Sequence, residues 1–174
     1  PVMESHWLSE LTGQPVWYKC ENLQRTGAYK LRGAYNMMSQ LTDAEKARGV
    51  VAASAGNHAQ GVALAAKVLG IKATIFMPVG ASLPKYEATL GYGAEVLLTG
   101  AIFDETLVAA KEFTAKTGAV FIPPFDDLDI ILIDAGGPKH GEEFMFIAAE
   151  PQADAVALHV FDCFDTSAFA GDIH

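Results

Sequence analysis

Cysteine is scarce in this chain of 174 residues, which contains only Cys20 and Cys163. The two lie far apart in the sequence, and no CxxC spacing is present. Disulfide frameworks and structural zinc sites depend on paired or clustered cysteines. We therefore expect no disulfide framework, no metal site and a reducing, cytoplasmic setting.

Positive charge is also in short supply. Twelve lysine and arginine residues face 21 aspartate and glutamate residues, which gives a formal net charge of −9. Binding to a nucleic acid or to an anionic membrane needs a basic surface. Neither partner is expected, although a local basic pocket for a single phosphate is compatible with this balance.

Long apolar runs are absent, and none approaches the roughly 20 residues that a membrane-spanning helix needs. Residues 1–4 (PVME) have neither the basic nor the apolar region of a signal peptide. Because position 1 is not methionine, we expect the natural chain to begin upstream. A hydrophobic content of 51% beside 19% charged residues predicts a globular protein.

Short apolar runs alternate with helical patterns through the middle of the chain. Continuously apolar strands that alternate with helices predict an α/β fold, an open parallel sheet with helices on both faces in three layers. Ligands of such sheets bind at the carboxyl ends of the strands. The predicted strands are 50–53, 72–77, 95–98 and 119–122, and the predicted helices are 57–69, 85–90 and 103–117.

The flanking sequence is less regular. An apolar and aromatic run predicts a strand over 14–20, and small and apolar residues at helical spacing predict a helix over 33–39. Beyond residue 129 the pattern predicts strands over 130–133 and 144–148, and either a helix or a strand over 153–161.

Lys30 lies in a glycine-containing stretch, TGAYKLRG, which we place in a turn just before the helix over 33–39. An arbitrary lysine is usually a solvated surface residue. A lysine held among apolar groups loses proton affinity and becomes a nucleophile suited to Schiff-base chemistry. Both interpretations are open from this stretch alone.

A second stretch, Ser54-Ala55-Gly56-Asn57-His58, follows a predicted strand and opens a predicted helix. Backbone N–H groups and small side chains at a helix N-terminus form a ready site for a carboxylate or a phosphate. Ser54 or Asn57 can also be interpreted as a helix cap. For His58 we favour the interpretation as a satisfied histidine in the first helical turn.

Both stretches resemble the motifs of one enzyme family. TGAYKLRG resembles the cofactor-lysine motif of fold-type-II pyridoxal-phosphate (PLP) enzymes of the tryptophan synthase β-like superfamily, and SAGNHAQG (54–61) resembles their second motif. The flanking runs KCENLQ, ATIFMP, LPK, YGAEV and FIPPFDD are similar to those of threonine dehydratases, also called threonine ammonia-lyases. The resemblance is nearly continuous from residue 2 to residue 129, and it implies the two-domain fold of that family.

The resemblance implies PLP as the cofactor, with Lys30 forming the internal aldimine (a Schiff base) and then acting as the base at the substrate Cα. Tyr29 would pack beside the cofactor, and Asn57 would bind its 3′ oxygen. L-Threonine, and also L-serine, would lose the β-hydroxyl and yield a 2-oxo acid and ammonia. The residues expected to line the pocket for the substrate carboxylate are Ser54, Ala55, Gly56 and His58.

The same resemblance implies a lyase of amino-acid metabolism, with a role in isoleucine biosynthesis and a homo-oligomeric state. Serine racemases that resemble this group place a second serine directly after the first, where it acts as a base on the opposite face. This chain has Ala55 there. Alanine has no proton to exchange, so elimination is favoured over racemisation.

The resemblance weakens after residue 127. The expected Gly-Gln-Gly-Thr stretch and the glycine-rich phosphate loop are missing there. Gly136 and Gly137 precede Pro138, which has no N–H, and form a poor phosphate nest. We expect residues 1–33 and 125–174 to be parts of a larger, incomplete PLP-binding domain, and residues 34–124 to form a smaller α/β domain.

Two explanations of this incomplete pattern are open. The chain is either part of a longer enzyme, which we favour, or an altered product whose small domain is intact. The second explanation makes it a catalytically silent binding or assembly module. A third hypothesis is a related PLP enzyme, such as a racemase or a β-replacing synthase.

Overall fold

The computed structural model describes residues 2–124, 145–148 and 157–160. The chain forms two compact units, one of residues 1–28 with 135–174 and one of residues 29–134. The expected division into an incomplete PLP-binding domain and a smaller domain stays a prediction.

The first unit contains a four-stranded sheet with the order β1-β2-β7-β8. The β2 and β7 strands are parallel, and the two outer pairings are antiparallel. Two of its strands, β2 and β7, lie within stretches predicted to be strands, and β1 was not predicted. The last strand, β8, resolves the open choice between helix and strand at residues 157–160 in favour of a strand. The bounds are β1 Val2–Glu4, β2 Trp17–Lys19, β7 Met145–Ala148 and β8 Ala157–Val160, with a 3-10 turn at Glu21–Leu23. The strand predicted over 130–133 lies outside the described residues.

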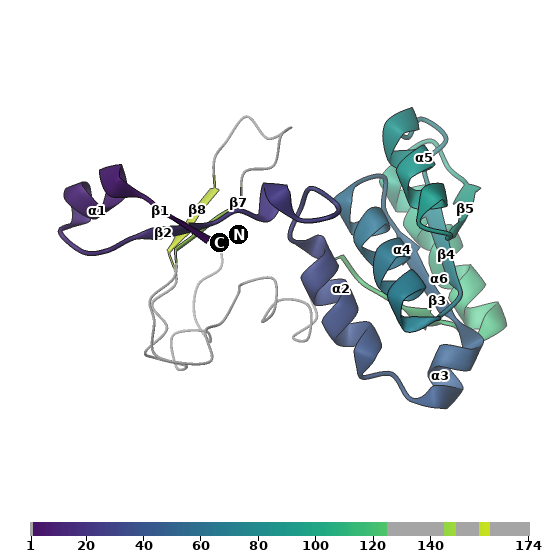
Figure 1. Cartoon of the computed structure of the whole chain (residues 1–174). Coiled ribbons are helices and arrows are strands. Elements are labelled where there is room, and N and C mark those ends of the chain that lie inside the picture. Colours follow the sequence, from purple (N-terminus) through teal and green to yellow (C-terminus); the bar gives the residue numbers. More distant parts are fainter. Residues whose placement is uncertain (1, 125–144, 149–156, 161–174) are drawn as a thin grey trace, which may run out of the picture. The chain divides into compact units, whose positions relative to one another are not determined.

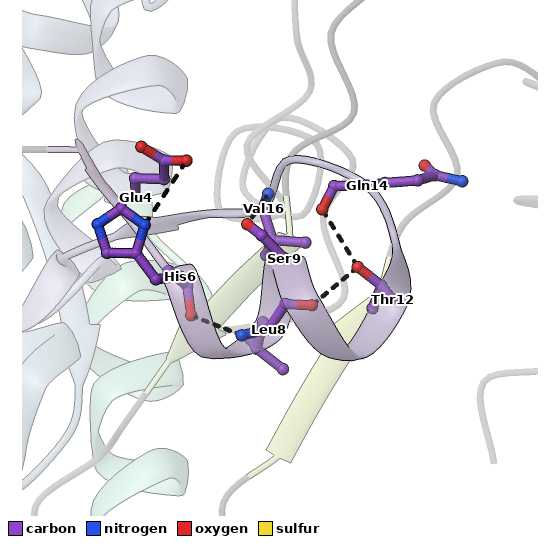
Figure 2. A network of polar contacts seen from close by, with 8 residues as sticks. Glu4, His6, Leu8, Ser9, Thr12, Gln14 and Val16 are labelled. Carbon is purple, nitrogen blue, oxygen red and sulfur yellow. Dashed lines mark hydrogen bonds and ion pairs between the residues drawn. The ribbon is translucent and has the colours of Figure 1, made fainter.

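A short helix, α1 (His6–Thr12), joins β1 to β2 and was not predicted. The Ser5 hydroxyl caps its N-terminus, and Gly13 ends it with a φ of 71°. Figure 2 shows how side chains tie the helix to the following turn: the Ser9 hydroxyl accepts from the Val16 N–H at 2.8 Å, and the Thr12 hydroxyl lies 3.3 Å from the Gln14 carbonyl. Within the helix, the same Thr12 hydroxyl donates to the Leu8 carbonyl. Caps and turns, rather than an apolar stripe, define this element.

The second unit is built on a fully parallel four-stranded sheet with the order β5-β4-β3-β6. All residues of the two central strands, β3 and β4, are buried. Strands covered on both faces are apolar throughout, which is why the uninterrupted apolar runs predicted them correctly. The bounds are β3 Val50–Ala53, β4 Ala73–Met77, β5 Glu95–Leu98 and β6 Val120–Phe121.

Helices cover both faces of this sheet, which confirms the three-layer α/β fold (Figure 1). Alternate residues of β3 divide between the two cores: Val50 and Ala52 pack beneath α2, α4 and α5, while Val51 and Ala53 pack beneath α6. None of the helices in the described ranges is long and apolar enough to cross a membrane. The bounds are α2 Lys30–Ser39, α3 Asp43–Arg48, α4 Asn57–Leu69, α5 Leu83–Gly91 and α6 Phe103–Thr117.

Helix α2 begins at Lys30, three residues before the predicted start at Gly33. Lys30 is therefore a residue of the first helical turn, and its prediction in a turn before the helix was wrong. Glycine is a poor helix former, which made Gly33 look like the boundary. Its burial beneath neighbouring elements offsets that weak propensity.

The strand order reverses at β3, which lies between β4 and β6. The chain runs outward from β3 through β4 to β5, then crosses under the opposite face in α6 and returns beside β3 as β6. Helix α4, which follows β3, and helix α6, which precedes β6, therefore cover opposite faces of the sheet. In open α/β sheets, ligands bind at the carboxyl ends of the strands where the strand order reverses.

Candidate functional site

Two loops meet at this reversal point. Residues 54–57 follow β3 and lead into α4, while residues 122–124 follow β6. The Ser54 N–H donates to the Phe76 carbonyl at 3.0 Å, and the Ile122 N–H donates to the Val51 carbonyl at 2.8 Å. These bonds extend the sheet pairing by one residue on each strand and bring both loops to the same edge.

The Lys30 amine reaches this edge from α2. Its Nζ donates to the Pro124 carbonyl at 2.9 Å, across 94 residues of sequence, and lies 4.9 Å from the centre of the Tyr29 ring. Lys30 and Tyr29 are both half-buried. The lysine singled out by its motif therefore lies at the carboxyl edge of the sheet.

Close packing of two helices fixes the backbone beneath Lys30. A Cβ added to Gly61 of α4 would lie 2.9 Å from the Lys30 carbonyl carbon and 3.0 Å from the Leu31 nitrogen. Only a glycine lets the two backbones approach this closely. Gly61 belongs to the second motif, but nothing in its spacing showed that its partner was the first turn of α2.

The N-terminus of α4 is open to an anion. Its N-cap is Gly56, which has no side chain to cap the helix. The Ser54 hydroxyl instead accepts from the Gly56 N–H at 3.1 Å and closes the preceding turn. The interpretation of Ser54 or Asn57 as the helix cap is therefore wrong. The first-turn N–H groups and the helix dipole favour a negatively charged ligand there.

The amine of Lys85 lies close to this turn. A Cβ added to Gly56 would lie 3.5 Å from the Nζ of Lys85, which is a residue of α5. The positive charge of Lys85 therefore adds to the field of the helix N-terminus. Lys85 lies in the LPK run, and no role was predicted for it, because only the packing of α5 beside α4 brings it here.

His58 is 4% exposed, and its Nε2 lies 3.0 Å from the Ile122 carbonyl. A carbonyl only accepts hydrogen bonds, so Nε2 carries the proton and Nδ1 is a bare acceptor. Among the described residues Nδ1 has no hydrogen-bond partner. Burial lowers the pKa of His58 to about 4, the bond to Ile122 opposes that shift, and the charge of Lys30 adds to it. The imidazole is therefore neutral near pH 7.

The structure thus brings the two sequence motifs together at one edge of one sheet. Tyr29 and Lys30 stand at the start of α2, and residues 54–58 form the turn and the first helical residues of α4. The side chains of Ser54, Ala55 and Asn57 are half-buried in that turn. No group of three or more potential metal ligands occurs within the described parts of the chain. The site combines an amine, an open helix N-terminus and a neutral imidazole.

Comparison with known proteins gives a consistent result. A family model described as pyridoxal-phosphate dependent enzyme matches residues 1–156. The chain is 55% identical over 138 residues to an L-threonine ammonia-lyase of Thermotoga maritima, a match that covers 79% of this chain and 34% of that protein. The chain therefore spans about a third of the length of this relative.

Solved structures agree with that similarity. The processed form of threonine deaminase isoform 2 from Solanum lycopersicum superposes with a TM-score of 0.70 at 45% identity, covering 76% of this chain and 37% of that one. Maize serine racemase gives a TM-score of 0.69 at 39% identity, covering 75% and 40%. Both matches extend beyond the sheet of the second unit to most of the chain.

Proposed function

The chain belongs to the family of pyridoxal-phosphate dependent enzymes, and from that premise we propose that it acts as a threonine ammonia-lyase. The reaction would convert L-threonine, and also L-serine, to a 2-oxo acid and ammonia by β-elimination. The observation that carries the proposal is the Lys30 amine, which lies at the reversal point of the sheet. The α4 N-terminus, open to an anion, begins at the same edge.

The residues at this edge fit the cofactor of the family. Pyridoxal phosphate carries an aldehyde that bonds to a lysine amine, and when bound it supplies an electron sink for deprotonation at Cα. Lys30 offers a half-buried amine beside the ring of Tyr29. Among the described residues, the Nδ1 of His58 has no hydrogen-bond partner and the N-cap of α4 is a glycine, so polar groups at this edge are left for a ligand to satisfy. Lys30, Tyr29 and Asn57 would hold the cofactor.

The turn before α4 would bind the substrate. Its N–H groups and the charge of Lys85 favour a carboxylate. Lys30 would take the proton from Cα and the β-hydroxyl would leave with a proton as water. Hydrolysis of the released product then consumes one water and gives the 2-oxo acid and ammonia. The residues proposed to line the carboxylate pocket are Ser54, Ala55, Gly56 and His58.

Serine racemisation is the second candidate, because maize serine racemase is similar over 75% of the chain. Racemisation needs a second proton-carrying group on the other face of Cα. Ala55 occupies the position after Ser54 and carries none. We therefore place elimination first. Chiral analysis of serine after incubation with either enantiomer separates the two activities.

The finer parts of the proposal rest on the family resemblance. We propose a role in amino-acid metabolism, specifically isoleucine biosynthesis, and a homo-oligomeric, cytoplasmic protein. The scarcity of cysteine supports a reducing compartment, and the net charge of −9 supports the absence of nucleic-acid or membrane partners. We also propose that residues 34–124 act as the smaller domain and residues 1–33 with 125–174 as part of the cofactor-binding domain.

Ammonia release from L-threonine by the purified chain with added pyridoxal phosphate tests the activity. Lys30→Ala is the variant, and Lys111→Ala in α6 is the matched control for loss of one lysine. We expect release by the wild type and the control and none by Lys30→Ala. Equal release by all three contradicts the role of Lys30. Cofactor bound at Lys30 without any ammonia release favours the silent binding module.

A further inference from the structure

We infer that His58 is a positioning residue for Lys30, acting through the segment of residues 122–124 that both side chains contact. His58 holds the first carbonyl of this segment, and Lys30 donates to the last. The inference rests on the proposed role of Lys30. It assigns to His58 a task different from lining the carboxylate pocket.

Three hydrogen bonds define the segment. The Ile122 N–H donates to the Val51 carbonyl at 2.8 Å, and the His58 Nε2–H donates to the Ile122 carbonyl at 3.0 Å. The Lys30 Nζ donates to the Pro124 carbonyl at 2.9 Å. One end of the segment is thus held by β3 and α4, and the other end receives the amine.

Two prolines limit the backbone hydrogen bonds that can fix this segment. Pro123 and Pro124 have no N–H, so the pairing of β6 with β3 cannot continue past Ile122. From that point the carbonyl groups alone can fix the segment by backbone hydrogen bonds. Apart from the bond of Lys30 itself, the His58 bond is therefore the one nearest to Pro124 in the part of the chain that the structure describes.

His58 is suited to this task because it is a neutral donor. The ring is buried, and its lowered pKa keeps one proton on the imidazole, on the nitrogen that faces Ile122. Through the segment it sets where the Pro124 carbonyl lies. That carbonyl accepts one N–H of Lys30 and so orients the amine. A loosened segment no longer presents this acceptor to the amine in a fixed direction.

Two substitutions of His58 distinguish the effect of its N–H donor from the effect of its imidazole ring. His58→Leu removes the donor, whereas His58→Gln places an amide N–H near the position of Nε2 and should restore it. Thr106→Val is the matched control, because Thr106 is fully buried and its hydroxyl bonds to Thr99 within the α6 region on the other face of the sheet. All three changes cost stability, so each comparison uses the folded protein.

The first measurement is amide hydrogen exchange of Ile122 in the full chain. We expect roughly a tenfold faster exchange in His58→Leu, the change that corresponds to loss of one buried hydrogen bond. His58→Gln and Thr106→Val should exchange within about twofold of the wild type after correction for global stability. Unchanged exchange in His58→Leu overturns the inference.

The second measurement is capture of pyridoxal phosphate by Lys30. Borohydride reduction and peptide mass spectrometry give the adduct at Lys30 relative to that at Lys111, an exposed lysine of α6. We expect this ratio to fall roughly tenfold in His58→Leu and to recover in His58→Gln. An unchanged ratio in His58→Leu, with normal capture by the wild type, overturns the inference alone. No capture at Lys30 in the wild type overturns the proposed function and the inference with it.

Discussion

At the scale of single residues, the Lys30 amine is placed by two contacts from different elements. Gly61 lets α4 approach the backbone of Lys30 within van der Waals contact, and the Pro124 carbonyl receives its Nζ. The first contact fixes the backbone from which the side chain starts, and the second fixes where it ends. Both contacts are long-range in sequence, and both partners, Gly61 and Pro124, lie outside the lysine motif.

Gly61→Ala tests the first contact. The added Cβ would meet backbone atoms at 2.9 to 3.0 Å, and such overpacking costs about 1–3 kcal/mol. Alanine regains about 1 kcal/mol of helix propensity. Gly91→Ala is also in a helix, but the added Cβ has open space around it. This variant therefore gains helix propensity without the cost of overpacking. Urea unfolding should therefore find Gly61→Ala the less stable variant by about 2 kcal/mol. Equal stabilities would show that the α2–α4 contact is not tight.

His58 gives a pH dependence of stability. Its pKa falls from 6.5 to about 4 on folding, so between these values the unfolded chain binds the proton and the folded chain does not. The free energy of unfolding therefore decreases as the pH falls through that interval, by about 3 kcal/mol in total from this group. Urea unfolding of the wild type and of His58→Gln at several pH values isolates the contribution. Parallel pH profiles of the two proteins would contradict the burial of a neutral His58.

At the scale of elements, the regular parts of the second unit could be predicted from the sequence. Helix α4 has the predicted bounds, because an apolar helical pattern ends at Gly70, which takes a φ of 69°. Helices α1 and α3 were missed, since their caps rather than an apolar periodicity define them. Thr42 and Glu45 form a capping box around α3, a helix with no buried residue. That T-x-x-E spacing was visible in the sequence and could have revealed it.

Truncation of Ile122, the residue that follows β6, tests whether core packing and the position of Lys30 are coupled. Ile122 and Ile75 are both fully buried in the core beneath α2 and α4, so truncation of either to alanine should cost about 2–5 kcal/mol. Ile122 also begins the segment that contacts Lys30, whereas Ile75 lies within β4. We expect only Ile122→Ala to lower the capture of pyridoxal phosphate by Lys30, measured against Lys111 on folded protein. Equal effects of both truncations would point to general loss of structure.

At the scale of the whole molecule, the strand order explains why the two motifs meet. Alternating strands and helices predicted a parallel sheet, which was confirmed, and a ligand site at its carboxyl edge, which stays a prediction. The pairs of atoms at that edge could not be predicted. Lys30 with Pro124 and His58 with Ile122 are 94 and 64 residues apart, and their meeting depends on the return of β6 beside β3. The local sequence pattern around each residue does not indicate which distant residue it will contact.

The central claim is that Lys30 is the residue that carries the cofactor, and mapping the bound cofactor tests it most directly. The chain is incubated with pyridoxal phosphate, reduced with borohydride, digested and analysed by mass spectrometry. Lys85→Ala is the matched control, because Lys85 is the other lysine beside the α4 N-terminus. We predict one dominant adduct, on Lys30, that persists in Lys85→Ala and disappears in Lys30→Ala. A dominant adduct on Lys85 or on another lysine, or no adduct above the level of exposed lysines, would contradict the account.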